Sequence, residues 1–186
     1  MKLLFSVCML ISLFTTLQAQ EKFYTKAGRI SFDATAANSP EKIVAEQTAA
    51  VCVLDTKTGN IQFSVLMTGF VFERAMMQEH FNENYVESRK FPKSEFKGAI
   101  TNPEAVTYTK DGSYKVRVKG QLNIHGISKD VETEGEIIVK GNKYTTRASF
   151  PVLLADYGIK VPSVVADKVG TQARIQVDCQ LEPLVR

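Results

Sequence analysis

Apolar and polar residues alternate with a period of two along most of the chain. In the segment 173–181 the odd positions carry Ala, Ile, Val, Cys and Leu, and every residue between them is polar or charged. Successive side chains of a β-strand point to opposite faces, so this pattern predicts a strand with one buried and one solvated face. The same alternation recurs at 29–34, 61–67, 114–122, 131–139 and 143–150.

Two pairs of consecutive segments are predicted to form hairpins. The first joins 49–54 to 61–67 through a turn rich in Thr, Gly and Asn. The second spans 113–140, and its turn centres between His125 and Gly126. This turn places three basic residues opposite three glutamates: Lys119 opposite Glu132, Arg117 opposite Glu134, and Lys115 opposite Glu136. Facing opposite charges favour a single register, and they put these glutamates on the solvated face rather than in a catalytic cluster.

One segment has the periodicity of a helix instead. Between 74 and 85, the residues Met77, Phe81 and Tyr85 recur every four positions among polar neighbours, which predicts a short helix with an apolar stripe. Many short antiparallel strands and one helix indicate a barrel or a sandwich. We expect a closed barrel, because closure removes exposed sheet edges.

The first 19 residues are predicted to be a cleavable signal peptide. Lys2 precedes a short apolar run, and the small residue Ala19 ends the segment. We expect cleavage there, leaving 20–186 as a single domain in the periplasm or outside the cell, with no later apolar stretch long enough for a membrane helix. Cys52 and Cys179 then remain. Export permits a disulfide between them, and two buried free thiols are an equal alternative.

The charge distribution and the absence of known motifs argue against several classes of function. The formal net charge is +3, with basic and acidic residues intermixed, so the chain has no basic field suited to nucleic acid. No metal-binding, haem-attachment, phosphate-loop or nucleophile-elbow pattern is present in the sequence, so we expect no metal, no cofactor and no enzymatic activity. The two histidines are His80 and His125. Each could contact a ligand; His125 also suits the turn, or could pin a neighbouring loop.

The predicted inward face carries no charged residue but several small ones. These are Gly120, Thr133, Gly135, Thr146, Ala148 and Ala173. Small inner side chains suit a barrel that leaves room for a ligand, although large neighbours could equally fill that room. From the residues alone, a hollow and a filled barrel both stay open.

Three segments resemble the YceI-like family of exported, lipocalin-like barrels that bind polyisoprenoids or other long lipids. They are the helix and its continuation over 76–96, the hairpin tip over 120–129, and the Asp-Tyr-Gly-Ile motif at 156–159. The resemblance implies an extended β-barrel with a long apolar tunnel and the helix near one end. It also implies carriage or storage of a polyisoprenoid, fatty acid or fatty amide, without a reaction.

The face assignment then selects the residues expected to contact such a ligand. These are Phe63, Val65, Met67, Met77, Phe81, Val116, Val118, Phe150 and Ile175, together with His80 and His125. Two other functions stay open: an enzyme acting on a lipid-like substrate through one of the histidines, and a solid-cored protein-interaction module. The sequence does not decide between a monomer and a homodimer.

Overall fold

A computed structural model describes residues 21–184 of the chain. It contains nine strands in this range: β1 (Lys22–Thr35), β2 (Val44–Asp55), β3 (Asn60–Leu66), β4 (Val71–Phe72), β5 (Lys93–Ile100), β6 (Gly112–Ile124), β7 (Ile127–Lys140), β8 (Lys143–Leu153) and β9 (Val169–Pro183). The helix α1 (Ala75–His80) continues into the π-helical turn η2 (Phe81–Tyr85). Short 3₁₀ turns complete the structure: η1 (Met67–Gly69), η3 (Pro103–Ala105), η4 (Leu154–Tyr157) and η5 (Ser163–Val165).

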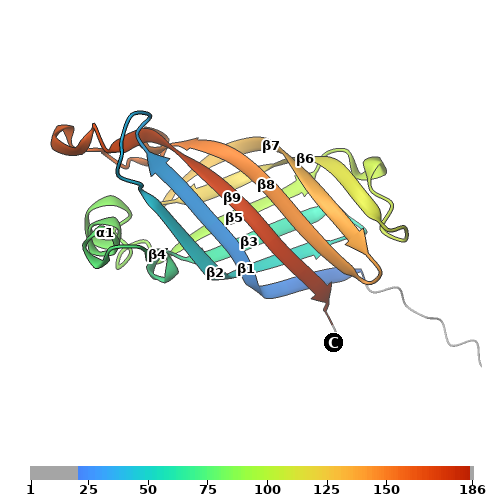
Figure 1. The fold of residues 1–186 in the computed structure, drawn as a ribbon. Coiled ribbons are helices and arrows are strands. Elements are labelled where there is room, and N and C mark those ends of the chain that lie inside the picture. Colours follow the sequence, from blue (N-terminus) through green and yellow to red (C-terminus); the bar gives the residue numbers. More distant parts are fainter. Residues whose placement is uncertain (1–20, 185–186) are drawn as a thin grey trace, which may run out of the picture.

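Eight of these strands close into an antiparallel barrel. Their order is β1-β9-β8-β7-β6-β5-β3-β2, and pairing between β1 and β2 joins the two ends of the sheet, while the two-residue β4 is added beside β2. Figure 1 shows the barrel as an elongated body with α1 at one end. The predicted all-β barrel with a short helix near 74–85 is therefore confirmed.

The predicted register of the second hairpin is also confirmed. Lys115 faces Glu136, Arg117 faces Glu134, and Lys119 faces Glu132 across β6 and β7. The turn between these strands has His125 and Gly126 at φ 53° and 75°, which is the left-handed conformation that a tight hairpin requires.

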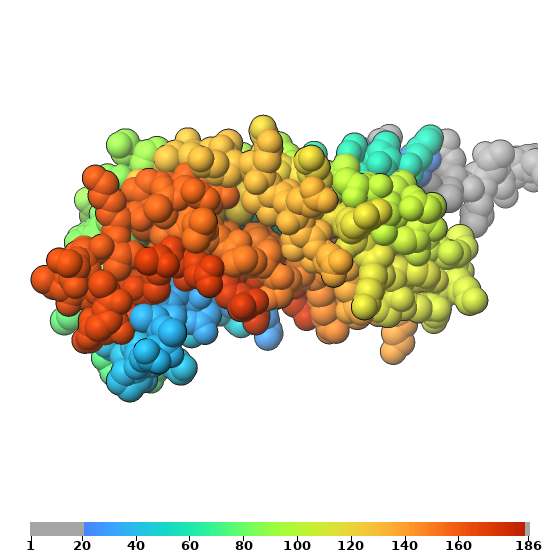
Figure 2. All heavy atoms as spheres, turned by 90° about the horizontal axis from the view of Figure 1, so that it is seen from above, coloured from blue at the N-terminus to red at the C-terminus, as the bar shows by residue number. Residues whose placement is uncertain are grey.

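The barrel has two ends with different connections. At one end, which we call the mouth, lie the β1–β2 loop, the segment from η1 to residue 92, and the segment from η4 to residue 168. The β1–β2 loop and the η4–η5 segment lie side by side there, in blue and orange-red, away from the yellow-green segment that contains η3 (Figure 2). The other end, the base, holds both ends of the described chain.

The base is filled by tightly packed apolar side chains. Phe23, Leu54 and Leu181 are almost fully buried there, and the centroids of the Phe23 and Tyr144 rings lie 4.1 Å apart. Burial raises the pKa of the neighbouring Tyr108 to about 12. The base is therefore the solid part of the barrel.

The two cysteines of the described chain are buried free thiols, which decides between the two alternatives left by the sequence. Cys52 lies on β2 and Cys179 on β9, the two strands that flank β1. Between them, β1 carries Gly28, which has no side chain. A Cβ at Gly28 would lie 2.5 Å from the Cys179 sulfur and 2.9 Å from the Ala50 carbonyl oxygen, so only glycine fits. Cys8 falls within the predicted signal peptide, outside the described residues, so the prediction for 1–19 is not tested.

We expect both buried thiols to react slowly in the folded protein, because a reagent cannot reach them without local opening. Burial, and then the adjacent Cys179, raise the pKa of the Cys52 thiol well above its ordinary value of 9.0, and only the thiolate is nucleophilic. The test uses the protein that begins at Gln20. At pH 8 a disulfide reagent should label its folded form roughly 100-fold more slowly than the same protein unfolded in guanidinium chloride. Rapid labelling of the native protein would contradict the buried placement.

The raised pKa of the Cys52 thiol also predicts how the free energy of unfolding changes at alkaline pH. The unfolded chain releases the Cys52 proton near the ordinary pKa of 9.0 while the folded chain retains it. The stability contributed by this group is therefore complete below pH 9.0 and is lost as the pH rises above that value.

No helix within residues 21–184 is both long enough and apolar enough to cross a membrane.

Candidate functional site

The barrel encloses a cavity of about 430 Å³ that extends from the mouth toward the base. Its walls are formed by inward-facing side chains of the strands, and α1 and η2 contribute Met77, His80, Phe81 and Tyr85 at the mouth. The lining is overwhelmingly apolar. Apolar cavities of this size are typical of small-molecule binding sites.

Ten of the eleven predicted contact residues line this cavity. They are Phe63, Val65, Met67, Met77, His80, Phe81, Val116, Val118, Phe150 and Ile175. His125 is not in the lining. The period-two alternation was sufficient to find the strand residues because one face of each strand must point inward. Whether any of them contacts a ligand stays a prediction.

Small side chains explain why the barrel is hollow. Thr133, Gly135, Thr146, Ala148 and Ala173 all line the cavity. Gly120 does not share this role. A Cβ at Gly120 would lie 2.8 Å from the Phe96 ring and 2.4 Å from the Cα of the facing Gly98, so this glycine pair makes room for an aromatic side chain rather than for a ligand.

An aromatic cluster attaches the helix to the mouth of the barrel. Phe81 of η2 packs against Phe32, Phe70 and Phe72, with ring centroids 5.1–5.8 Å apart. No side chain caps the N-terminal end of α1, and near its C-terminal end the Asn82 side-chain amide donates to the Gln78 carbonyl oxygen at 2.9 Å. Because a helix of six residues is too short to be stable alone, it depends mainly on the packing of Met77 and Phe81. Sequence reasoning missed Phe32, Phe70 and Phe72 as site residues, although Phe32 belongs to a predicted strand.

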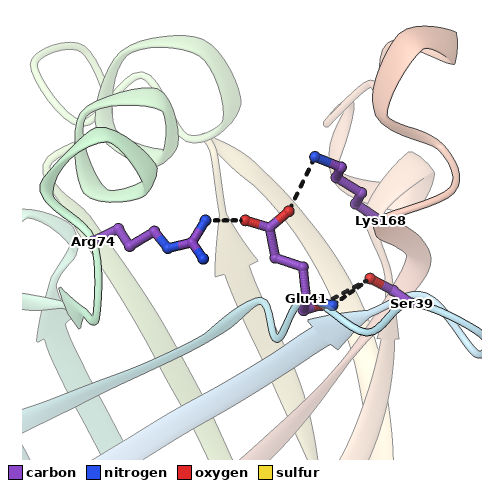
Figure 3. A network of polar contacts seen from close by, with 4 residues as sticks. All are labelled: Ser39, Glu41, Arg74 and Lys168. Carbon is purple, nitrogen blue, oxygen red and sulfur yellow. Dashed lines mark hydrogen bonds and ion pairs between the residues drawn. The ribbon is translucent and has the colours of Figure 1, made fainter.

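Polar side chains gather where the cavity opens at the mouth. The Glu41 carboxylate accepts a hydrogen bond from Arg74 Nη1 at 2.6 Å through Oε1, and its Oε2 lies 3.1 Å from Lys168 Nζ. Figure 3 shows the three side chains reaching toward one another from separate segments, with the Ser39 hydroxyl beside the Glu41 backbone. All three line the cavity. No motif predicts this cluster, because its members come from parts of the sequence far apart.

His125 fastens two mouth segments to the β6–β7 turn. Its Nδ1 donates to the Tyr157 carbonyl oxygen at 3.0 Å, and its Nε2 lies 2.7 Å from a Glu87 carboxylate oxygen. Its ring also meets the Phe91 ring edge-on at 4.6 Å. Glu87 and His125 both have positive φ, so their contact stabilises two strained backbone positions. The structure thus supports the turn and loop-pinning interpretations of this residue.

We expect His125→Ala to destabilise the ligand-free protein by about 1–3 kcal/mol, because a buried carbonyl and a carboxylate lose their partner. Urea unfolding measures the change. His80→Ala is the matched control, since the His80 side chain is exposed. This substitution should change the free energy of unfolding by no more than about 0.5 kcal/mol. Equal effects of the two substitutions would show that His125 does not hold the loops together.

The described residues contain no group of three or more His, Cys, Asp or Glu side chains that could hold a metal ion. Of the histidines, one is engaged in holding loops and the other borders an apolar cavity. Neither has a nucleophile beside it among the contacts described above.

Comparisons with known proteins place this barrel among similar folds. The YceI-like domain matches residues 9–181. A polyisoprenoid binding domain from Saccharophagus degradans, implicated in plant cell wall breakdown, superposes with a TM-score of 0.74 at 10% identity, covering 89% of this chain and 100% of that one. BcnA of Burkholderia cenocepacia gives 0.63 at 16% identity, covering 83% and 95%. No curated protein matches the chain in sequence.

Proposed function

The chain belongs to the YceI-like family, and we propose that it is an exported binding protein that holds one long apolar molecule inside its barrel for carriage or storage. The observation that carries this proposal is the cavity of about 430 Å³ with its apolar walls. Water gains little from contact with such walls, whereas a hydrocarbon chain in the same space leaves water altogether. A solid-cored interaction module is correspondingly disfavoured.

The elongated cavity suits a linear ligand, such as a polyisoprenoid, a fatty acid or a fatty amide. A polyisoprenoid binding domain shares the fold, which supports the first of these classes by analogy. Each methylene that leaves water contributes about 0.8 kcal/mol. Affinity should therefore increase with chain length until the cavity is full, which would distinguish enclosure of the chain from surface adsorption.

We propose that the predicted signal peptide at 1–19 directs export of the protein into the periplasm or out of the cell. A water-insoluble molecule needs a carrier in such an aqueous compartment, because it otherwise stays in a membrane. Expression of the full chain in a Gram-negative host, followed by fractionation and N-terminal sequencing, tests this part. A product that begins at Gln20 is expected, and retention of Met1 would contradict export.

Mild purification followed by native mass spectrometry tests the binding itself. We expect a mass excess equal to one bound molecule, which organic extraction then releases for identification. A protein that is purified empty and also takes up no isoprenoid, fatty acid or fatty amide would overturn the proposal.

A further inference from the structure

The cluster of Glu41, Arg74 and Lys168 is the charged part of the cavity mouth. Three other charged residues border the cavity, but Glu95, Glu136 and Arg147 occupy strand positions that alternate with inward-facing ones, and each has a polar partner on the outer surface. Glu95 lies 3.9 Å from Lys97, Glu136 accepts from Ser113, and Arg147 lies 3.0 Å from Asp178. Glu41, Arg74 and Lys168 instead lie where the apolar tunnel reaches solvent.

The two cations are held in place by one largely buried anion. The Glu41 side chain is 20% exposed, whereas Arg74 and Lys168 are 65% and 49% exposed. Its two oxygens are each used by one cation, so Glu41 sets the spacing between them. The charged ends of Arg74 and Lys168 therefore stay accessible from the mouth, although each is paired with Glu41.

Both cations keep hydrogen-bond donors that the Glu41 contact does not use. An arginine has five N–H donors and a lysine three, and the contacts with Glu41 involve Nη1 of Arg74 and Nζ of Lys168. One carboxylate also leaves one positive charge in excess. The cluster thus offers N–H donors and one excess positive charge to a group at the open end of the tunnel.

We propose that Arg74 and Lys168 form a head-group site for an amphiphile with an anionic head, a phosphate or a carboxylate, whose apolar tail occupies the tunnel. This inference rests on the proposed function. Arginine pairs with phosphate and carboxylate groups through parallel N–H donors. A neutral head would leave the excess charge uncompensated, and a cationic head would be repelled. His80, exposed on α1 and also in the lining, borders the same opening.

The test compares two ligands that differ only in the head group. Geranylgeranyl monophosphate and geranylgeraniol probe the phosphate, and palmitate and hexadecanol probe the carboxylate, each pair being competed for the delipidated protein by native mass spectrometry. We expect a preference of roughly tenfold for the anion in at least one pair, decreasing as salt is raised. The pair that shows it identifies the chemistry of the head.

Two variants locate the preference. Arg74→Gln/Lys168→Gln should reduce it to about one, without loss of alcohol binding. The matched control is Arg29→Gln/Lys143→Gln, which removes two exposed cations paired with Glu46 and Glu182 away from the mouth, and it should leave the preference unchanged. Thermal unfolding verifies that every variant is folded.

The outcomes separate this inference from the proposed function. If neither member of either pair binds, the carrier function itself fails. If anion and alcohol bind equally well to the wild-type protein, the head-group site is wrong while the carrier function stands. A preference that survives in Arg74→Gln/Lys168→Gln would also overturn the assignment of these two residues.

Discussion

Ala148→Phe should abolish ligand retention while leaving the barrel folded. Ala148 lies at mid-length of β8, beside Gly135 and Val177 of the neighbouring strands, and its side chain lines the cavity. A phenyl ring at this position occupies space that a linear ligand must cross. Since the ring enters a void rather than a packed core, the usual penalty for overpacking, about 1–3 kcal/mol, should be small or absent here.

Native mass spectrometry of the purified variant measures the result, and we expect the bound fraction to decrease at least roughly tenfold. Ser149→Phe is the matched control, because it adds the same ring one residue further along, on the outer face of β8. That control should retain its ligand. If folded Ala148→Phe keeps a full complement of ligand, the cavity is not the binding site.

Leu54→Ala should cause a large loss of stability at the base of the barrel. Leu54 is 0% exposed, faces Phe23 across β1 and β2, and is packed in the solid base of the barrel. Truncating a buried leucine to alanine costs about 2–5 kcal/mol. The transfer free energy of the removed methyl groups is lost, and the void that they leave costs packing energy as well. For a domain of this size, each kcal/mol lowers the Tm by about 2–4 °C.

Calorimetry or urea unfolding of the delipidated protein checks this value. Leu153→Ala provides the comparison, since Leu153 is 52% exposed, and its effect should stay within about 0.5 kcal/mol. Leu54 does not line the cavity, so the folded variant should still bind ligand. A loss below about 1 kcal/mol would show that the base is not the rigid core of the barrel.

The predictions that succeeded rest on local periodicity. The strand at 173–181 and the helical repeat of Met77, Phe81 and Tyr85 each follow from neighbours in sequence, because one face of each element must be buried. The β6–β7 register followed from charges placed symmetrically about His125 and Gly126. These features depend on residues within one or two adjacent elements.

The site was predicted only in part, for the same reason. Its apolar walls repeat the strand pattern, but its mouth depends on Glu41, Arg74 and Lys168, which meet only when three loops converge. Likewise, Gly120 reads as a small lining residue until β5 pairs with β6 and the Phe96 ring covers it. The partners of His125, Glu87 and Tyr157, are also distant in sequence.

By itself, the sequence determined which face of each strand is uncharged, where one helix lies, and how the central hairpin pairs. Each of these is a local property of spacing and charge. Only the tertiary structure decided that the sheet closes through β1 and β2, that the uncharged faces enclose empty space, and that two thiols remain free beside Gly28. Whether small residues leave a void depends on how far apart the opposing walls stand, and that distance is set by closure of the whole barrel.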